Sequence, residues 1–369
     1  MHIRAAVLHA PKTPFQIETL TLEAPRTGEV LVRLAACGVC HSDWHVATGD
    51  TRHPLPCVCG HEGAGVVEAV GPEVQAIAPG DHVVLSWAPD CGHCFYCEHG
   101  QPNLCETFTG PIWAGTMLDG TPRLRRADGS PVFHYCGTAA FAEYTVVPQQ
   151  SCVVIRRDVP LEVASLVGCA VATGVGAVLY TAGVRAGESV VVYGCGGVGL
   201  STVQGAALSG AGAVIAVDPA PERRAIAREL GATHTLDGSA GTLRQIRTLT
   251  SGRGADHVFE AVGQPHVQEA ALEAVRPGGT LTLVGLSPMG TGTNLPGAVI
   301  VRQEKTIKGS YYGSVHARRD FPLFLDLYMA GKLPLDRLVT QHYRLDQINE
   351  AFAAMLGGSG ARGVITFEP

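Results

Sequence analysis

The sequence predicts an α/β protein with two domains, a mostly-β unit at the N-terminus and a doubly wound parallel sheet after it. The chain has 369 residues, which is long for one hydrophobic core and suits two. Up to about residue 150, short strand-like runs are punctuated by Gly and Pro. After about residue 170, continuous apolar strands alternate with helix-like stretches, which is typical of a parallel sheet covered on both faces.

The elements follow in order along the chain. In the N-terminal part we expect strands at residues 29–34, 64–70 and 82–85. The stretch 106–140 is rich in Gly, Asp and Arg and is expected to be an irregular surface excursion. In the second part the predicted strands are 189–193, 213–217, 257–259 and 280–284, with helices at 197–210 and 221–230. A helix around 321–330 and a final strand at 363–367 could close back on the first domain.

Composition narrows the class of protein. Hydrophobic residues make up 46% and charged residues 16%, which indicates an ordered chain. The net charge of −6 argues against a nucleic-acid partner, and Arg123, Arg125 and Arg126 beside Asp119 are interpreted as a solvated loop. The uncharged run 163–184 is rich in Gly and Ala, so we expect buried core and no membrane span.

Twelve cysteines without a recognisable secretory signal indicate a reducing compartment, with cytoplasm as the default. In such a compartment, regular cysteine spacing favours metal ligation over disulfides. Six of the twelve can be assigned to two metal sites. We expect the other six to be small buried hydrophobic residues; they are Cys37, Cys57, Cys59, Cys136, Cys152 and Cys195.

The first predicted metal site is closed. Its four thiolates are Cys91, Cys94, Cys97 and Cys105, on one short loop. Four thiolates saturate a tetrahedral zinc and leave no position for a substrate. An iron–sulfur cluster is the rival, but its fourth cysteine follows after three residues and precedes Pro, whereas Cys105 follows Cys97 after seven residues. The spacing therefore favours a structural zinc.

The second predicted site is open. Cys40 and His61 form a Cys/His pair that needs one more protein ligand, and Cys169 is the best candidate. Spacing alone leaves Cys169 equally well explained as an inert core thiol. Asp43 would orient His61 through a carboxylate–imidazole hydrogen bond, and Glu62 would either approach the metal or be a buried paired charge. A site with a free coordination position suits catalysis.

A glycine-rich turn follows the predicted strand 189–193 and opens a helix, as a dinucleotide fingerprint requires. Its residues are Gly194, Cys195, Gly196, Gly197, Val198 and Gly199. Asp218 ends the next strand, where a carboxylate accepts hydrogen bonds from ribose hydroxyls and repels a 2′-phosphate, so NAD is favoured over NADP. Arg223 and Arg224 lie close enough in sequence to weaken that preference.

Taken together, these motifs resemble the zinc-containing medium-chain alcohol dehydrogenases. The resemblance rests on residues 38–43 and 60–63, the four-cysteine loop, the turn with Asp218, and residues 362–367, and it spans nearly the whole chain. It implies a GroES-like catalytic domain at residues 1–172 and 313–369 and a Rossmann NAD-binding domain at residues 173–312. It also implies that Cys169 is the third ligand of a catalytic zinc, and that each chain carries two Zn²⁺ ions.

The same resemblance implies roles for side chains near the open site. Ser42 would accept the proton of the alcohol and pass it through the nicotinamide ribose to His45 at the solvent. His41 stands where many relatives have an arginine that grips the coenzyme phosphate, while Arg362 matches the family's other phosphate-binding arginine. Trp87 matches a position that lines the substrate pocket and suggests a narrow one.

The expected activity is a zinc-dependent alcohol dehydrogenase that oxidises a primary aliphatic or benzylic alcohol with NAD, as a homodimer or a homotetramer. Alternatives are a biosynthetic reductase, an enzyme that keeps NAD bound and recycles it with an external acceptor, and a thiol-dependent formaldehyde dehydrogenase. The last loses support because residues 107–109 hold no arginine to bind the thiol's carboxylate. A non-catalytic dinucleotide or zinc sensor is disfavoured because Ser42, His61 and Cys169 are all present.

Overall fold

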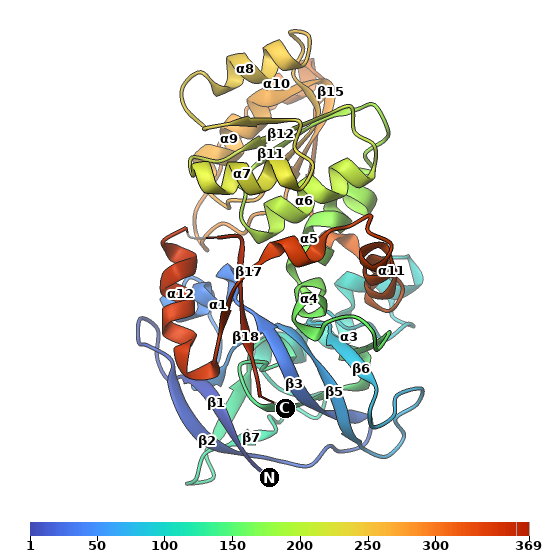
Figure 1. Cartoon of the computed structure of the whole chain (residues 1–369), viewed down its shortest axis with the longest axis vertical. Coiled ribbons are helices and arrows are strands. Elements are labelled where there is room, and N and C mark those ends of the chain that lie inside the picture. Colours follow the sequence, from blue (N-terminus) through green and yellow to red (C-terminus); the bar gives the residue numbers. More distant parts are fainter. Residues whose placement is uncertain (359, 369) are drawn as a thin grey trace.

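The computed structural model describes residues 1–358 and 360–368, which fold into two lobes (Figure 1). Both chain ends lie in the lower lobe of the view. The lower lobe holds two β-systems, and the upper lobe holds a parallel sheet between helices. The chain passes from the lower lobe to the upper one through α5 (Ala170–Gly176) and returns near residue 311.

The lower lobe is built from a closed barrel and a seven-stranded sheet. The barrel runs β1 (His2–Leu8), β2 (Gln16–Leu22), β7 (Leu124–Arg125), β8 (Pro131–His134), β4 (Cys57–Val58). The sheet runs β10 (Cys152–Ile155), β6 (His82–Leu85), β5 (Glu62–Val70), β3 (Glu29–Gly38), β18 (Arg362–Thr366), β17 (Val339–Tyr343), with β9 (Tyr144–Pro148) also paired to β3. Its helices are α1 (His41–Thr48), α2 (Phe95–Glu98), α3 (Glu106–Ala114), α4 (Leu161–Ser165), α11 (Ala317–Met329) and α12 (Ile348–Leu356).

The upper lobe is a six-stranded sheet in which every pairing is parallel. Its order is β13 (His234–Leu236), β12 (Ala213–Val217), β11 (Ser189–Tyr193), β14 (Ala255–Glu260), β15 (Val275–Leu283), β16 (Thr306–Gly309). The accompanying helices are α6 (Gly197–Leu208), α7 (Pro221–Glu229), α8 (Thr242–Leu249), α9 (Pro265–Ala274) and α10 (Gly297–Arg302). The strand order reverses between β11 and β14, so a crevice forms at the carboxyl ends of these strands.

The predicted strands and helices of both parts are present, with bounds shifted by a few residues. The C-terminal strand β18 pairs antiparallel with β3, with Val364 opposite Gly38, so the last segment does return to the N-terminal sheet. All twelve cysteines are free thiols, and the six left outside the metal sites are buried, as expected. His93 and His99 of the four-cysteine loop are exposed.

Two expectations for residues 106–140 are wrong. The segment is not irregular, because α3, β7 and β8 lie within it and two of them complete the barrel. Arg123 is not solvated: its side chain is 1% exposed and pairs with Glu29 at 2.5 Å and Asp119 at 2.8 Å. The Glu29 partner lies 94 residues away in sequence, which is why the local charge pattern was misleading.

No single helix of the described residues is long and apolar enough to cross a membrane. One pair, Leu161–Gly168 and Ala170–Ala182, passes that test together but is bent by 56°. Most of its residues are buried inside the protein, in agreement with the expected core role of the uncharged run.

Candidate active site

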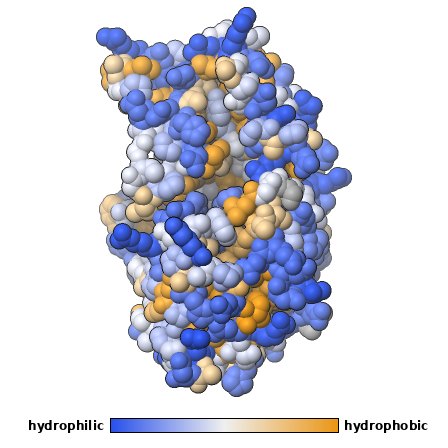
Figure 2. All heavy atoms as spheres, turned by 90° about the vertical axis from the view of Figure 1, so that its left-hand side faces the viewer, coloured by the Kyte–Doolittle hydropathy of each residue, from blue (hydrophilic) through white to orange (hydrophobic). Residues whose placement is uncertain are grey.

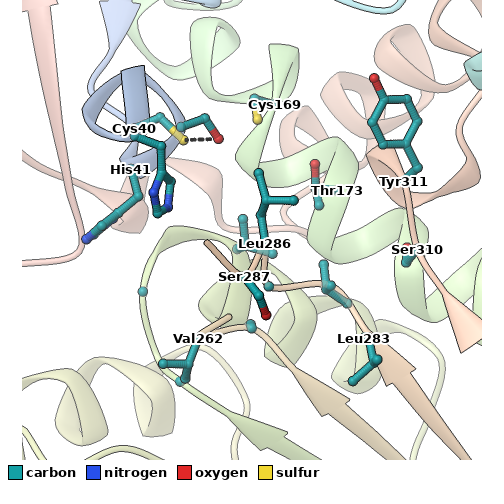
Figure 3. A pocket seen from close by; sticks show the side chains of 18 of the residues that line it. Cys40, His41, Cys169, Thr173, Val262, Leu283, Leu286, Ser287, Ser310 and Tyr311 are labelled. Atoms are coloured by element: carbon teal, nitrogen blue, oxygen red, sulfur yellow. Dashed lines mark hydrogen bonds between the residues drawn. The ribbon is translucent and has the colours of Figure 1, made fainter. Parts of the chain in front are cut away.

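A cleft of about 2040 Å³ lies between the two lobes and takes its walls from both. In Figure 2 the surface is hollowed at mid-height between the upper and lower parts, and hydrophobic side chains are visible there. The predicted coenzyme turn, the open metal set and Trp87 all line this one cleft. Figure 3 shows Cys40 and His41 on one side, Cys169 and Thr173 in the centre, and Val262, Leu283 and Leu286 below.

The open metal set is assembled from three separate segments. Cys40 precedes α1, His61 precedes β5, and Cys169 precedes α5. Together with Glu62 they offer ligand atoms that all lie within 4.8 Å of one another, and all four residues are buried. A hydrogen bond from the Cys169 thiol lowers the pKa of Cys40 despite its burial, so one sulfur of the pair is readily a thiolate.

His61 is held in the orientation that a metal ligand needs. Its Nδ1 lies 3.1 Å from Oδ1 of Asp43, which also accepts the backbone N–H of Gly60 at 2.8 Å. Its Nε2 is buried and has no hydrogen-bond partner among the described residues. Burial alone would lower the pKa of His61, but the charges of Asp43, Cys169 and Cys40 raise it well above its usual value. An unpaired ring nitrogen beside two sulfurs fits a bound cation.

Glu62 forms a buried ion pair with Arg362. Its Oε2 accepts a hydrogen bond from Nη2 of Arg362, and both side chains are at most 5% exposed. Burial raises the pKa of Glu62 to about 7, although the Arg362 charge opposes the shift. The sequence left two roles open for Glu62, and the structure shows a buried charge paired with Arg362. A carboxylate oxygen of Glu62 also lies within 4.8 Å of the ligand atoms of Cys40, His61 and Cys169.

The four-cysteine set is assembled as its spacing predicts. The Sγ atom of Cys94 lies 3.5 Å from that of Cys97 and 3.8 Å from that of Cys105, and the Sγ atoms of Cys91 and Cys97 are 4.0 Å apart. All four sulfurs lie within 4.8 Å of one another, the separation expected around a tetrahedral zinc. Both donor sets therefore fit zinc, one with four sulfurs and one with sulfur, nitrogen and a nearby carboxylate.

Ser42 and His45 share the first turns of α1, so their side chains project from one face of the helix. Both line the cleft. The Cys40 sulfur lies 3.7 Å from Oγ of Ser42, the contact dashed in Figure 3. Nδ1 of His45 lies 3.5 Å from Oδ2 of Asp50, a carboxylate that is 44% exposed. The arrangement fits a path from the donor set to the solvent.

The glycine-rich turn has the geometry that a dinucleotide fingerprint requires. Gly194 has φ +89°, and a Cβ at Gly196 would meet nothing within 4 Å, so the backbone is open to the cleft. A Cβ at Gly199 would lie 1.7 Å from the carbonyl oxygen of Gly194. The start of α6 can therefore pack this closely against the end of β11 only because residue 199 has no side chain. Arg362 packs against Gly197, and Val198 also lines the cleft.

Asp218 lies at the end of β12 and faces the same cleft. Its Oδ2 accepts the backbone N–H of Cys195 at 2.8 Å, and its Oδ1 accepts that of Ala220 at 2.9 Å. Arg223 lines the cleft, whereas Nη1 of Arg224 donates to the carbonyl oxygens of Asp218 and Pro219 and is turned away. Of the two arginines, only Arg223 is placed to face a dinucleotide, together with His41 on the opposite lobe.

Sequence reasoning missed most of the aromatic wall around Trp87. The rings that line the cleft there are Trp113, Tyr135, Tyr311 and Tyr312. Tyr311 contacts Trp87 edge-on, with 5.2 Å between ring centroids. The hydroxyl of Tyr135 donates to the carbonyl oxygen of Ser42 at 3.2 Å. Apart from the neighbours Tyr311 and Tyr312, these residues belong to different segments, and no local spacing signals that they converge.

Comparisons with known proteins agree with this geometry. Residues 26–157 match the family model described as the alcohol dehydrogenase GroES-like domain, and residues 197–330 match the one described as zinc-binding dehydrogenase. The NDMA-dependent alcohol dehydrogenase of Amycolatopsis methanolica is 44% identical over 99% of both chains. The chain belongs to the zinc-containing medium-chain alcohol dehydrogenase family. As a member it is an oxidoreductase, with a GroES-like lobe and a Rossmann lobe.

Solved structures of alcohol dehydrogenases and their relatives superpose over the whole chain. Benzyl alcohol dehydrogenase from Acinetobacter calcoaceticus has a TM-score of 0.94 at 33% identity, and the match covers 100% of both chains. A zinc-binding dehydrogenase from Sinorhizobium meliloti 1021, bound to NADP, has a TM-score of 0.82 at 26% identity, with the same coverage. The alcohol dehydrogenase fold is thus shared along the full length of the chain.

Proposed function

We propose that this alcohol dehydrogenase oxidises primary alcohols with NAD at the Cys40–His61–Cys169 site, and that aromatic alcohols are among its substrates. The proposal rests chiefly on the buried donor set opening into the same cleft as the dinucleotide turn. The wall of Trp87, Trp113 and Tyr311 suits a planar ring, because aromatic pairs gain from edge-on and offset contacts. The similarity to a benzyl alcohol dehydrogenase supports the same class.

The residues present fit two zinc ions and NAD. A zinc ion held by Cys40, His61 and Cys169 supplies Lewis-acid chemistry that makes an alcohol more acidic. Asp43 contacts Nδ1 of His61, so Nε2 on the other side of the ring points away from the Asp43 carboxylate and is free to bind the metal. Ser42, on the cleft side of the donor set, takes the alcohol proton, and His45 delivers it to the solvent. Loss of that proton together with a hydride would convert the alcohol to an aldehyde, and NAD bound in the cleft would accept the hydride.

NAD is proposed over NADP because Asp218 presents a carboxylate where a 2′-phosphate would lie. The test is NADH formation by the purified protein with a panel of aliphatic and benzylic alcohols, with NADP in parallel. We expect turnover with NAD that o-phenanthroline abolishes. Preference for NADP would overturn the coenzyme assignment, and silence with both coenzymes would contradict alcohol oxidation with an exchangeable coenzyme.

A second candidate differs only in how the coenzyme is used. The similarity to an NDMA-dependent alcohol dehydrogenase favours an enzyme that retains its dinucleotide and regenerates it with an external acceptor. His41, in place of the family's arginine, predicts the opposite, a looser phosphate contact. The two are separated by adding an alcohol and an aldehyde to dialysed protein without free NAD. Interconversion of the pair indicates a retained coenzyme, and its absence indicates an exchangeable one.

We also propose a homodimer in the cytoplasm. The edge strand β16 leaves one side of the parallel sheet unpaired within the described residues, and Val301 of the adjacent α10 is 76% exposed. An unpaired edge beside exposed apolar side chains suits association with a second copy. Sedimentation analysis should give twice the 38.6 kDa of one chain, and a monomer or tetramer would contradict the assignment.

A further inference from the structure

Tyr311 forms part of the cleft wall at the point where the chain leaves the Rossmann lobe. It follows β16 and precedes the short helix η6 (Tyr312–Ser314). The residue is 40% exposed, and its ring packs nearly perpendicular to that of Trp87. In Figure 3, Tyr311 stands across the cavity from Cys40, beyond Thr173. A substrate large enough to extend from the donor set across the cleft would reach this ring.

The backbone after Tyr311 is unusual. Tyr312, Gly313 and Ser314 have φ values of +56°, +64° and +55°, a conformation that residues other than glycine rarely adopt. Such a segment persists only where surrounding contacts hold it. One such contact is the hydroxyl of Tyr312, which donates to the carbonyl oxygen of Gly168. Another is the carbonyl oxygen of Tyr311, which accepts the N–H of Ser314 at 3.1 Å.

The same carbonyl oxygen also accepts a side-chain hydrogen bond. Nδ2 of Asn103 donates to the oxygen of Tyr311 at 2.9 Å, across 208 residues of sequence. Asn103 is 8% exposed and lies in the short helix η1 (Pro102–Leu104), between Cys97 and Cys105 of the four-cysteine set. Gln101 and Leu104 of the same stretch line the cleft too. The four-cysteine segment is therefore directly bonded to the aromatic wall.

We infer that Asn103 is a positioning residue for substrate selection: its hydrogen bond fixes Tyr311 and lets the four-cysteine segment set the width of the aromatic pocket. The inference rests on the proposed function, because it assumes that the substrate occupies this cleft. The Asn103 hydrogen bond should improve the kcat/KM of large aromatic alcohols, because these reach Tyr311. It should have little effect on the kcat/KM of ethanol, which does not span the cleft. The four-cysteine segment thereby contributes to specificity as well as to stability.

The test compares wild type with Asn103→Leu and Asn103→Ser, which both remove the amide donor. For a naphthyl methanol, KM should rise and kcat/KM should fall about fivefold, the effect of losing one neutral hydrogen bond, with kcat and ethanol kinetics little changed. Glu98→Gln, an exposed change in the same loop, is the matched control. Zinc content and the thermal midpoint are measured on every variant to exclude loss of the four-cysteine site.

The double variant that combines Asn103→Leu with Tyr311→Ala separates a positioning role of Asn103 from a general structural effect. If Asn103 acts through Tyr311, Asn103→Leu should have no further effect on the naphthyl-to-ethanol ratio once Tyr311→Ala is present. An unchanged ratio in the single variants would overturn the inference, as would a full effect in the Tyr311→Ala background. Failure of the proposed function is distinguishable, because wild type would then oxidise neither alcohol.

Discussion

A single buried pair links the two halves of the site at the scale of residues. Glu62 belongs to the open donor set, and its partner Arg362 packs against Gly197 of the coenzyme turn. The pair spans 300 residues, from the start of β5 to the start of β18. Either charge alone would be costly in this environment, so each stabilises the position of the other.

At pH 8, above the pKa of about 7 of Glu62, Glu62→Gln should lower the free energy of unfolding by about 3 kcal/mol, because it leaves the Arg362 guanidinium buried without the carboxylate that pairs with it. Chemical denaturation of wild type and variant measures the difference. Glu68→Gln is the matched control on the same strand: Glu68 is 53% exposed, and its contact with Arg33 should contribute less than about 1 kcal/mol. Equal effects of the two substitutions would contradict the prediction, because the buried pair would then contribute no more than an exposed contact.

Asp218→Asn should relax the choice of coenzyme. The amide keeps the size of the side chain but removes the charge that we propose repels a 2′-phosphate, and Arg223 lines the same cleft, where it would attract one. The NADP-to-NAD ratio of kcat/KM should rise about tenfold, which corresponds to about 1.4 kcal/mol. Steady-state kinetics with both coenzymes measures it. An unchanged ratio would show that Asp218 serves only the turn, through the N–H groups of Cys195 and Ala220.

At the scale of elements, local patterns predicted the site better than its surroundings. The coenzyme turn, the four-cysteine loop and the α1 turn with Ser42 and His45 are each encoded within 15 consecutive residues. Contacts between distant segments left no such signal. The burial of Arg123 against Glu29 and the bond from Asn103 to Tyr311 depend on how β-elements and loops pack, which spacing cannot reveal.

The barrel strand β8 places a neutral histidine in the core and should make stability depend on pH. Burial, followed by the Arg123 charge, lowers the pKa of His134 to about 3. The unfolded chain binds a proton near pH 6.5, so stability should be full above that pH and fall as pH decreases toward 3. Between pH 7 and pH 5 the loss attributable to His134 is about 2 kcal/mol.

Urea denaturation at these two pH values tests this prediction in wild type and in His134→Gln. Glutamine keeps an acceptor for the N–H of Arg123, which His134 accepts through Nε2 at 3.2 Å. The variant should lose less stability on acidification than wild type. His99→Gln, an exposed change, should retain the wild-type pH dependence. A similar loss in all three proteins would assign the acid sensitivity to other groups.

At the scale of the whole molecule, the cleft between the lobes unites what the sequence presented as separate motifs. The donor set comes from the lower lobe, the dinucleotide turn comes from the upper lobe, and residue 311 lies where the chain crosses back. The family resemblance predicted this union, whereas spacing alone left even Cys169 undecided between ligand and core thiol. The shape of the aromatic pocket required the folded chain, because its rings come from four separate segments.

The most direct test of the central claim is the zinc content of Cys169→Ala, measured together with its alcohol oxidation. We expect the bound zinc to fall from two ions per chain to one, turnover to be lost, and the circular dichroism spectrum to match that of wild type. The four-cysteine site would keep its ion, since none of its sulfurs comes from α5 or the residue before it. Retention of both ions with undiminished turnover would contradict the assignment of Cys40, His61 and Cys169 as the catalytic metal site.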